Sequence, residues 1–317
     1  MSIQVCATLG GNLGKPKCDV TMGRPKYPLP TTGKEFTAAD LADSDSFKAA
    51  LMAAMLLAKS DPNKVYAFPE MRDITDNTGD PQTQALADGY EEVLNEALPK
   101  YLLRSTPGVC VQQKMASFNG WGGGMYVIDH NNILWYRTTA SGGGKAFTCG
   151  YLYTNPPKFK GSGDINTANT RLTFGSVDEF KYGVGALKLD FNVKDLVNLI
   201  DVVLDDRETE NTSGALNNVL IIGGKTDCEK VDIYDAYSAV LAFPARWKAY
   251  TADGTVLTVQ TVTVNAGLKG WNITIAIADF NAMASGTVFY VDLAAPSVLH
   301  AAGVDGIEGN KVRFVKF

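Results

Sequence analysis

The chain has 317 residues, of which 45% are apolar and 20% are charged, and its net charge at pH 7 is -5. This composition is close to the globular average, so it excludes disorder for most of the length, and the length suggests about two domains. The 29 basic residues form no run of five or six, so no surface for stable nucleic-acid binding is expected.

Neither a membrane span nor a leader sequence is predicted. The longest nearly apolar run, residues 49–58, is far shorter than the about 20 residues that a spanning helix needs. Residues 1–9 lack a basic region and a long apolar stretch, so we expect synthesis in a cytoplasm. The five cysteines are widely spaced without a C-x-x-C pair, which favours free thiols in a reducing compartment over a disulfide scaffold or a zinc site. They are Cys6, Cys18, Cys110, Cys149 and Cys228.

Residues 1–35 are rich in Gly, Pro and Lys and show little periodicity. A segment of this kind cannot form a core of its own. We interpret it as an extended arm that becomes ordered by lying across a neighbouring molecule. The alternative is a mobile terminus without a role.

The clearest predicted helix covers residues 46–59, which are rich in Ala, Leu and Met. Asp45 or Ser46 is expected to cap its start, and Pro62 to end it. Spacings of four and three residues give it one apolar face, which we interpret as core packing. That face consists of Phe47, Leu51, Met55 and Ala58.

After this helix the pattern changes to short β-rich runs separated by turns. Residues 64–68 read as a strand, residues 72–88 as a polar acidic loop, and residues 90–104 as a strand interrupted at Pro99. Part of this last stretch also fits a helix.

The strongest hairpin signal is residues 125–136, where Asn131 and Asn132 tolerate the positive φ angles of a type I′ turn. Residues 192–204 are predicted as a second helix capped by Asn192. Further strands are expected at 146–153, 170–174 and 185–191. The predicted first domain, residues 36–205, is therefore a β-sandwich or barrel with one or two flanking helices.

The polar, acidic stretch 205–218 is interpreted as a linker, so a second domain is expected over residues 206–317. Within it, residues 255–264 alternate polar and apolar side chains over part of their length, as a half-buried antiparallel strand does. About seven strands in about 100 residues suggest an immunoglobulin-like β-sandwich. The expected strands are 219–222, 231–243, 247–252, 255–264, 271–277, 287–293 and 311–317.

Catalytic motifs are not found. The two histidines, His130 and His300, are expected to lie in a turn and to pack, respectively, and no G-x-S-x-G sequence is present. A pairing of Cys110 or Cys149 with His130 has no supporting sequence signature. Adjacent carboxylates such as Glu91 and Glu92, or Asp205 and Asp206, are expected on solvated surfaces. We therefore predict no catalytic residue.

Ligand-binding motifs are also incomplete. Residues 221–226 (IIGGKT) and 141–145 (SGGGK) lack the first glycine of a phosphate-binding loop, so their glycines are interpreted as turns. Residues 73–79 loosely match a calcium loop but have the glycine one place late and lack the final glutamate. We predict neither a cofactor nor a metal site.

Two parts of the chain resemble phage virion proteins. Residues 86–119 (LADGYEEVLNEALPKYLLRSTPGVCVQQKMASFN), the hairpin YVIDHNNILWY and residues 151–174 (YLYTNPPKFKGSGDINTANTRLTF) resemble structural proteins of tailed phages that infect Bacteroidota, particularly tail-tube proteins. Residues 296–316 (PSVLHAAGVDGIEGNKVRFVK) resemble the end of immunoglobulin-like modules that decorate such proteins.

The resemblance implies a non-enzymatic virion protein of the phage tail. Its subunits would form hexameric rings that stack into a tube, which contacts other tail proteins and lets DNA pass without specific binding. Residues 1–35 and the acidic loop 72–88 would make the contacts between rings, and the immunoglobulin-like domain would face outward. No catalytic residue is carried over from this family.

Two other functions remain open at this level. One is a capsid decoration protein or a receptor- or glycan-binding virion protein, with Trp247 or Trp271 of the second domain meeting the target. The other is a hydrolase with paired carboxylates.

Overall fold

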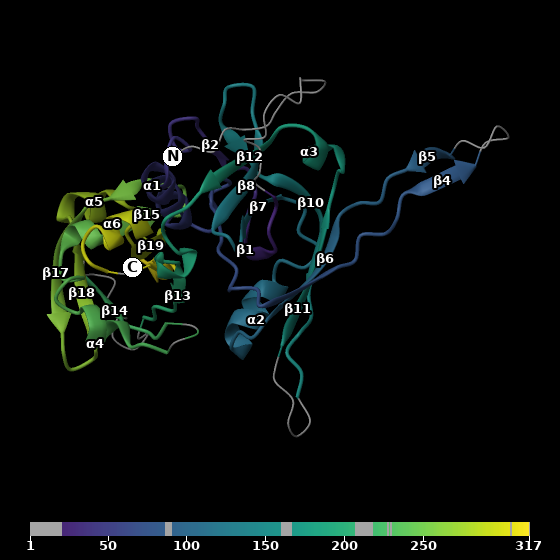
Figure 1. The fold of residues 1–317 in the computed structure, drawn as a ribbon. Coiled ribbons are helices and arrows are strands. Elements are labelled where there is room, and N and C mark those ends of the chain that lie inside the picture. Colours follow the sequence, from purple (N-terminus) through teal and green to yellow (C-terminus); the bar gives the residue numbers. More distant parts are fainter. Residues whose placement is uncertain are drawn as a thin grey trace. The chain divides into compact units, whose positions relative to one another are not determined.

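A computed structural model of the chain describes residues 21–85, 91–159, 167–206, 218–226, 228, 230–304 and 306–316 (Figure 1). The chain is mainly β, as predicted, and its contacts divide it into two compact units. Unit 1 is Met1–Met55 with Lys59–Leu196, and unit 2 is Leu56–Ala58 with Val197–Phe317. The division after Leu196 falls nine residues before the predicted end of the first domain at residue 205.

Unit 1 contains twelve strands and three short helices among its described residues. The helices are α1 (Ser44–Met55), α2 (Val109–Ala116) and α3 (Asp178–Lys181), with a 3-10 turn η1 (Val193–Asp195). The strands are β1 (Pro25–Thr31), β2 (Glu35–Phe36), β3 (Asp73–Asp76), β4 (Gln82–Ala85), β5 (Glu91–Asn95), β6 (Lys100–Ser105), β7 (Gly124–Asp129), β8 (Ile133–Thr138), β9 (Gly144–Lys145), β10 (Phe147–Thr154), β11 (Ala168–Phe174) and β12 (Val184–Lys188).

Ten of these strands form one antiparallel sheet in the order β2-β9-β8-β7-β10-β11-β6-β3, with β1 paired to β7 and β12 paired to β8. Side chains alternate across β7, so its two faces enter different cores. Tyr126 and Ile128 pack on one side with α1, and Met125 and Val127 pack on the other with β10, β11 and α2. The strands β7 and β8 therefore form the middle layer of unit 1.

Helix α1 confirms the predicted helix, but its ends differ from the expectation. The carboxylate of Asp43, two residues before the expected caps, accepts the N–H of Ser46 at 2.7 Å. The helix stops at Met55 because the buried Lys64 donates from Nζ to the Met55 carbonyl at 2.7 Å.

The expected strand at residues 64–68 is wrong, for a reason found in β1. Tyr66 and Phe68 donate their N–H groups to the carbonyls of Pro30 and Pro28. The two prolines have no N–H with which to donate back, so only half of a strand ladder forms. The only bridge here joins Val65 to Thr31.

Residues 1–20 of the predicted N-terminal arm lie outside the described residues. The rest of that stretch is not an arm, because β1 and β2 belong to the sheet and Tyr27 and Leu29 are buried in the core beneath α1. Residues 25–31 are rich in proline, which has no backbone N–H. Proline is tolerated in this strand because it stands at positions where no N–H donor is needed.

The predicted hairpin at residues 125–136 is confirmed, with a different turn. Only Asn132 has a positive φ, of 61°, and its N–H donates to the Asp129 carbonyl. A type I′ turn needs positive φ at both central residues, so this is a three-residue loop that ends in a left-handed residue.

Unit 2 is a β-sandwich with short helices between its strands. The strands are β13 (Ile200–Val202), β14 (Asn218–Ile222), β15 (Trp247–Thr251), β16 (Val256–Leu257), β17 (Val259–Asn265), β18 (Gly270–Ile275), β19 (Val288–Leu293), β20 (Ile307–Gly309) and β21 (Val312–Val315). The helices are α4 (Ile233–Tyr237), α5 (Ile277–Ala282) and α6 (Pro296–His300), with a 3-10 turn η2 (Pro244–Arg246).

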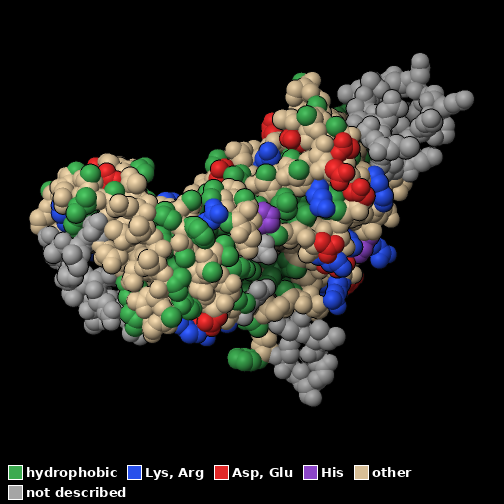
Figure 2. All heavy atoms as spheres, turned by 90° about the vertical axis from the view of Figure 1, so that its left-hand side faces the viewer, with side chains coloured by type: hydrophobic (Ala, Val, Ile, Leu, Met, Phe, Trp, Pro, Cys, Tyr) green, Lys and Arg blue, Asp and Glu red, His purple; other side chains and the backbone are tan. Residues whose placement is uncertain are grey.

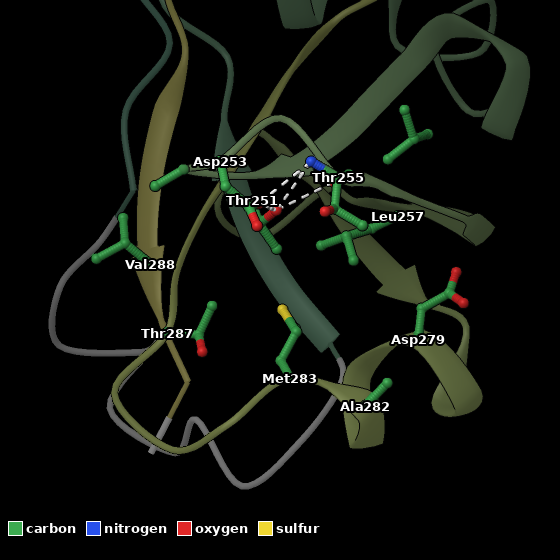
Figure 3. A pocket seen from close by; sticks show the side chains of 11 residues that line it. Thr251, Asp253, Thr255, Leu257, Asp279, Ala282, Met283, Thr287 and Val288 are labelled. Atoms are coloured by element: carbon green, nitrogen blue, oxygen red, sulfur yellow. Dashed lines mark hydrogen bonds between the residues drawn. The ribbon is translucent and has the colours of Figure 1, made fainter.

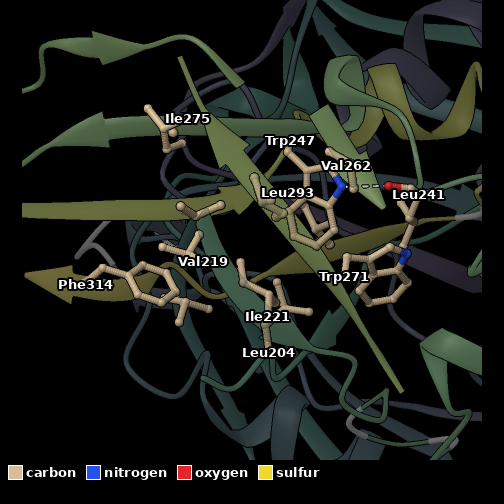
Figure 4. Packing of buried hydrophobic residues seen from close by; sticks show 14 of the residues in the cluster. Leu204, Val219, Ile221, Leu241, Trp247, Val262, Trp271, Ile275, Leu293 and Phe314 are labelled. Atoms are coloured by element: carbon tan, nitrogen blue, oxygen red, sulfur yellow. Dashed lines mark hydrogen bonds between the residues drawn. The ribbon is translucent and has the colours of Figure 1, made fainter. Parts of the chain in front are cut away.

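The sandwich consists of a three-stranded sheet, β14-β18-β17, and a four-stranded sheet, β16-β15-β19-β21. Their inner faces share one core, in which the rings of Trp247 and Trp271 lie 5.6 Å apart (Figure 4). A two-stranded parallel pair, β13 and β20, adds to this unit.

Two elements near the start of unit 2 differ from the prediction. Asn192 caps only the 3-10 turn η1, because the β-branched residues that follow form β13 against β20. The expected strand 231–243 begins instead with helix α4, since the Asp232 carboxylate accepts the N–H groups of Tyr234 and Asp235.

Candidate interaction surfaces

The acidic segment predicted as a loop at residues 72–88 is largely a β-hairpin arm. Its root is the pairing of β3 with β6, and its outer part is the separate two-stranded sheet of β4 and β5 (Figure 1). Every residue of β4 and β5 is exposed. We call the described residues 77–85 and 91–98 the hairpin arm.

The hairpin arm combines negative charge with exposed aliphatic side chains. Residues 73–99 contain seven acidic residues and no Lys, Arg or His. Val93 and Leu94 are 53% and 59% exposed. Burying such a side chain contributes about 1.5–3 kcal/mol, so the arm forgoes this stabilisation in the isolated chain.

The root of the arm is held by polar contacts on both sides. Arg104 of β6 pairs with Asp73 of β3 at 2.5 Å, and the N–H of Asn77 donates to the Lys100 carbonyl at 2.8 Å. At the other side, the Lys181 ammonium pairs with Glu96, which raises the pKa of Lys181. The arm is therefore a defined structural element and leaves the sheet at a fixed register.

The same strands carry a second exposed surface. On the outer face of β10, β11 and β6, the register places Tyr153 beside Arg171 and Arg171 beside Leu102. One row further, Tyr151 lies beside Thr173, and Thr173 beside Lys100. We call Tyr151, Tyr153, Arg171, Leu102 and Lys100 the tyrosine–arginine face.

The tyrosine–arginine face is basic and partly apolar. The Tyr151 and Tyr153 rings stack with their centroids 6.3 Å apart, and Tyr151 is 45% exposed. Lys100 and Arg171 are exposed, and Leu102 is half-buried. The nearest carboxylate in the register on the same face, Asp73, is already paired with Arg104. The face therefore offers two cations beside an aromatic pair.

A pocket of about 330 Å³ in unit 1 lies beside the entry to β1. Its walls are mainly apolar, and Arg24 and Asp76 are its charged residues. Its apolar lining includes Trp135, Phe147, Phe174 and Phe180. Such walls have few polar groups for fixing a small ligand, and no catalytic arrangement results.

A second pocket, of about 420 Å³, lies in unit 2 (Figure 3). Its two carboxylates are already engaged: Asp253 accepts hydrogen bonds from Thr251 and Thr255, and Asp279 accepts the Thr258 N–H at 2.7 Å. These hydrogen bonds lower the pKa of both Asp253 and Asp279. Asp253 closes a turn, and Asp279 links α5 to Thr258, so each carboxylate has a structural role.

Within each unit, the described residues considered for catalysis form no catalytic group. His130 is exposed in the β7–β8 turn of unit 1, while His300 ends α6 in unit 2. Burial raises the pKa of the free Cys149 thiol to about 11, so it is a poor nucleophile at neutral pH. Glu91 and Glu92 are successive strand residues and point to opposite sides of the arm.

The cysteine prediction needs a correction. Cys110 and Cys228 each take part in a disulfide bond, so not all cysteines are free thiols. Cys6 and Cys18 lie outside the described residues. Wide sequence spacing does not exclude a disulfide, because the pairing depends on distance in the fold.

The glycine-rich motifs have structural roles. A Cβ on Gly224 would lie 1.5 Å from the Val203 carbonyl oxygen, so the IIGGKT glycine permits close packing of two backbone segments. Residues 73–76 of the calcium-like pattern form β3. Among the described residues, no group of three or more His, Cys, Asp or Glu side chains is placed to hold a metal ion.

The tryptophans considered for glycan binding are in the core. Trp247 and Trp271 are 5% and 0% exposed, and the indole N–H of Trp247 donates to the Leu241 carbonyl (Figure 4). The indole N–H of Trp271 donates to the Ser238 carbonyl. Both tryptophans are core residues and unavailable to a sugar, so they do not support the glycan-binding alternative. The partly exposed aromatic pair of unit 2 is Tyr250 with Tyr290, whose rings lie 5.7 Å apart.

Basic side chains are dispersed over the visible surface. On the face drawn in Figure 2, Lys and Arg lie among Asp and Glu. In the parts of the chain that are described, no helix is long and apolar enough to cross a membrane. No protein-family model matches the chain, and a search of curated proteins finds no match.

Sequence reasoning missed the tyrosine–arginine face. It assigned the acidic residues 72–88 to contacts between rings but missed their hairpin structure. The outer face of β10, β11 and β6 depends on register between strands that are distant in sequence, which no local pattern specifies. The sequence indicates the arm by one feature: residues 73–99 contain no basic residue.

Proposed function

We propose that this chain is a structural protein that assembles with copies of itself, as the subunit of a phage tail tube. The observation that carries the proposal is the hairpin arm. It has a defined register at its root and exposed Val93 and Leu94 at its outer part, yet it packs on no core. Such a surface is typical of a segment that is completed by a partner.

The remaining features support this function without specifying it. The mainly β fold leaves strand edges that closed symmetric assembly would cover. The net charge of -5 suits a conduit through which DNA passes without adhering. The segments 86–119 and 151–174, on which part of the resemblance to tail-tube proteins rests, include the whole of the arm's second strand, β5, and all five residues of the tyrosine–arginine face.

The test is the mass and shape of the purified chain at rising concentration, by light scattering with negative-stain microscopy. We expect rings or tubes with an open lumen. A variant in which residues 77–98 are replaced by Asn-Gly should keep its fold, because the described residues of this segment belong to none of the hydrophobic cores, but should no longer assemble.

A wild-type chain that remains a discrete monomer or trimer without a lumen would contradict the tube function and favour a capsid decoration or receptor-binding protein. Circular dichroism of the Asn-Gly variant serves as the control for folding.

A further inference from the structure

We propose that the hairpin arm of one copy docks on the tyrosine–arginine face of a second copy. This inference rests on the proposed self-assembly and specifies its contact. It names two surfaces of unit 1 that are separate on one chain and complementary between two chains.

Charge is the first argument for this pairing. The arm presents Glu91 and Glu92 on a segment that lacks any basic residue. The face presents Lys100 and Arg171, and the nearest carboxylate in the register on the same face, Asp73, is already paired with Arg104. Complementary charges of this kind steer association and disfavour contact between two arms or two faces.

Apolar surface is the second argument. Successive residues in β5 point to opposite sides, so one side presents Glu91 with Val93 and the other presents Glu92 with Leu94. Either side combines a carboxylate with an aliphatic group. The face offers the matching combination, because the stacked Tyr151 and Tyr153 adjoin Arg171 in the register. Buried aromatic and arginine side chains are the usual anchors of protein interfaces.

The placement of the two surfaces explains why a second copy is needed. Strand β6 contributes Lys100 and Leu102 to the face and also forms the root of the arm. The arm continues outward from this root, and all residues of β4 and β5 remain exposed on their own chain. Contact of an arm with the next copy's face is head-to-tail, which generates rings or filaments.

The experiment uses charge reversal in the full chain. One variant carries Glu91→Lys and Glu92→Lys in the arm, and a second carries Lys100→Glu and Arg171→Glu in the face. A matched control carries Lys225→Glu and Arg313→Glu, two exposed positions of unit 2. Sedimentation velocity and light scattering over a concentration series give the concentration for half-association.

We expect that concentration to rise about tenfold or more for the arm variant and for the face variant, each measured alone, and to stay within about twofold for the control. Mixing the arm and face variants in equal amounts should restore association, because each reversed surface then meets an opposite charge on the other chain. A single chain with all four substitutions should also associate.

The outcomes separate this contact from the proposed tube. Rings that form normally from the face variant would overturn the docking site while leaving self-assembly intact. Association that depends on both surfaces but yields only open dimers would support the contact and contradict the tube. A wild-type chain that never associates would overturn both the docking contact and the tube function. Binding of the arm to a different protein, without any self-association, would also overturn both.

Discussion

Two hairpins of unit 1 differ in nearly every physical respect. The β7–β8 hairpin lies between two cores, and Tyr126, Ile128 and Leu134 are fully buried. The β4–β5 hairpin is exposed at every described strand position. The first is stabilised by its own chain, whereas the second has side chains whose burial requires another molecule. The comparison separates residues that specify the fold from residues that specify a contact.

Asp129 is the strongest test of the buried hairpin. Its carboxylate is fully buried and accepts hydrogen bonds from the N–H groups of Gly23, Asn131 and Ile133 and from the indole N–H of Trp135. Asp129→Ala should leave these donors without an acceptor and lower the free energy of unfolding by about 3 kcal/mol or more.

Urea denaturation followed by fluorescence and circular dichroism measures this loss. The matched control is Asp80→Ala in the exposed arm, which should change stability by less than about 0.5 kcal/mol. Similar losses for the two variants would remove the distinction between the hairpins.

Asn132 tests the turn that joins β7 and β8. It combines a φ of 61° with two hydrogen bonds, from Nδ2 to the carbonyls of Leu189 and Phe191. Asn132→Gly keeps the backbone conformation and loses the hydrogen bonds, at a cost of about 1–2 kcal/mol. Asn132→Ala should cost about 1 kcal/mol more, because alanine is strained at this φ.

Thermal unfolding of the two variants gives this order directly. Equal thermal stability of the Asn132→Ala and Asn132→Gly variants would show that this turn does not require a left-handed residue.

The same contrast explains what the sequence could predict. The β7–β8 hairpin and α1 follow from local patterns, because alternation and helix propensity agree there with the tertiary packing. The strand expected at residues 64–68 failed because its partner contains Pro28 and Pro30, a non-local cause. The helix expected from Asn192 failed because pairing of β13 with β20 overrides local propensity.

The candidate contact was less accessible to sequence reasoning. The strand predicted at residues 90–104 with an interruption at Pro99 corresponds to β5 and β6, but residues 72–88 were predicted as a loop. The pairing of β4 with β5 was missed because strands with exposed faces on both sides show no apolar alternation. The tyrosine–arginine face assembles side chains from three strands between residues 100 and 173, so it exists only once the sheet register is known.

The smallest expected change in stability is at Val93 and Leu94. Because both side chains are more than half exposed, Val93→Ser with Leu94→Ser should alter the free energy of unfolding of the monomeric chain by less than about 0.5 kcal/mol. Self-association of the same variant should weaken, since the arm loses its aliphatic groups. Denaturation at low concentration and light scattering at high concentration separate the two effects. A large loss of monomer stability would mean that the arm packs on its own chain, and unchanged association would mean that its carboxylates suffice for the contact.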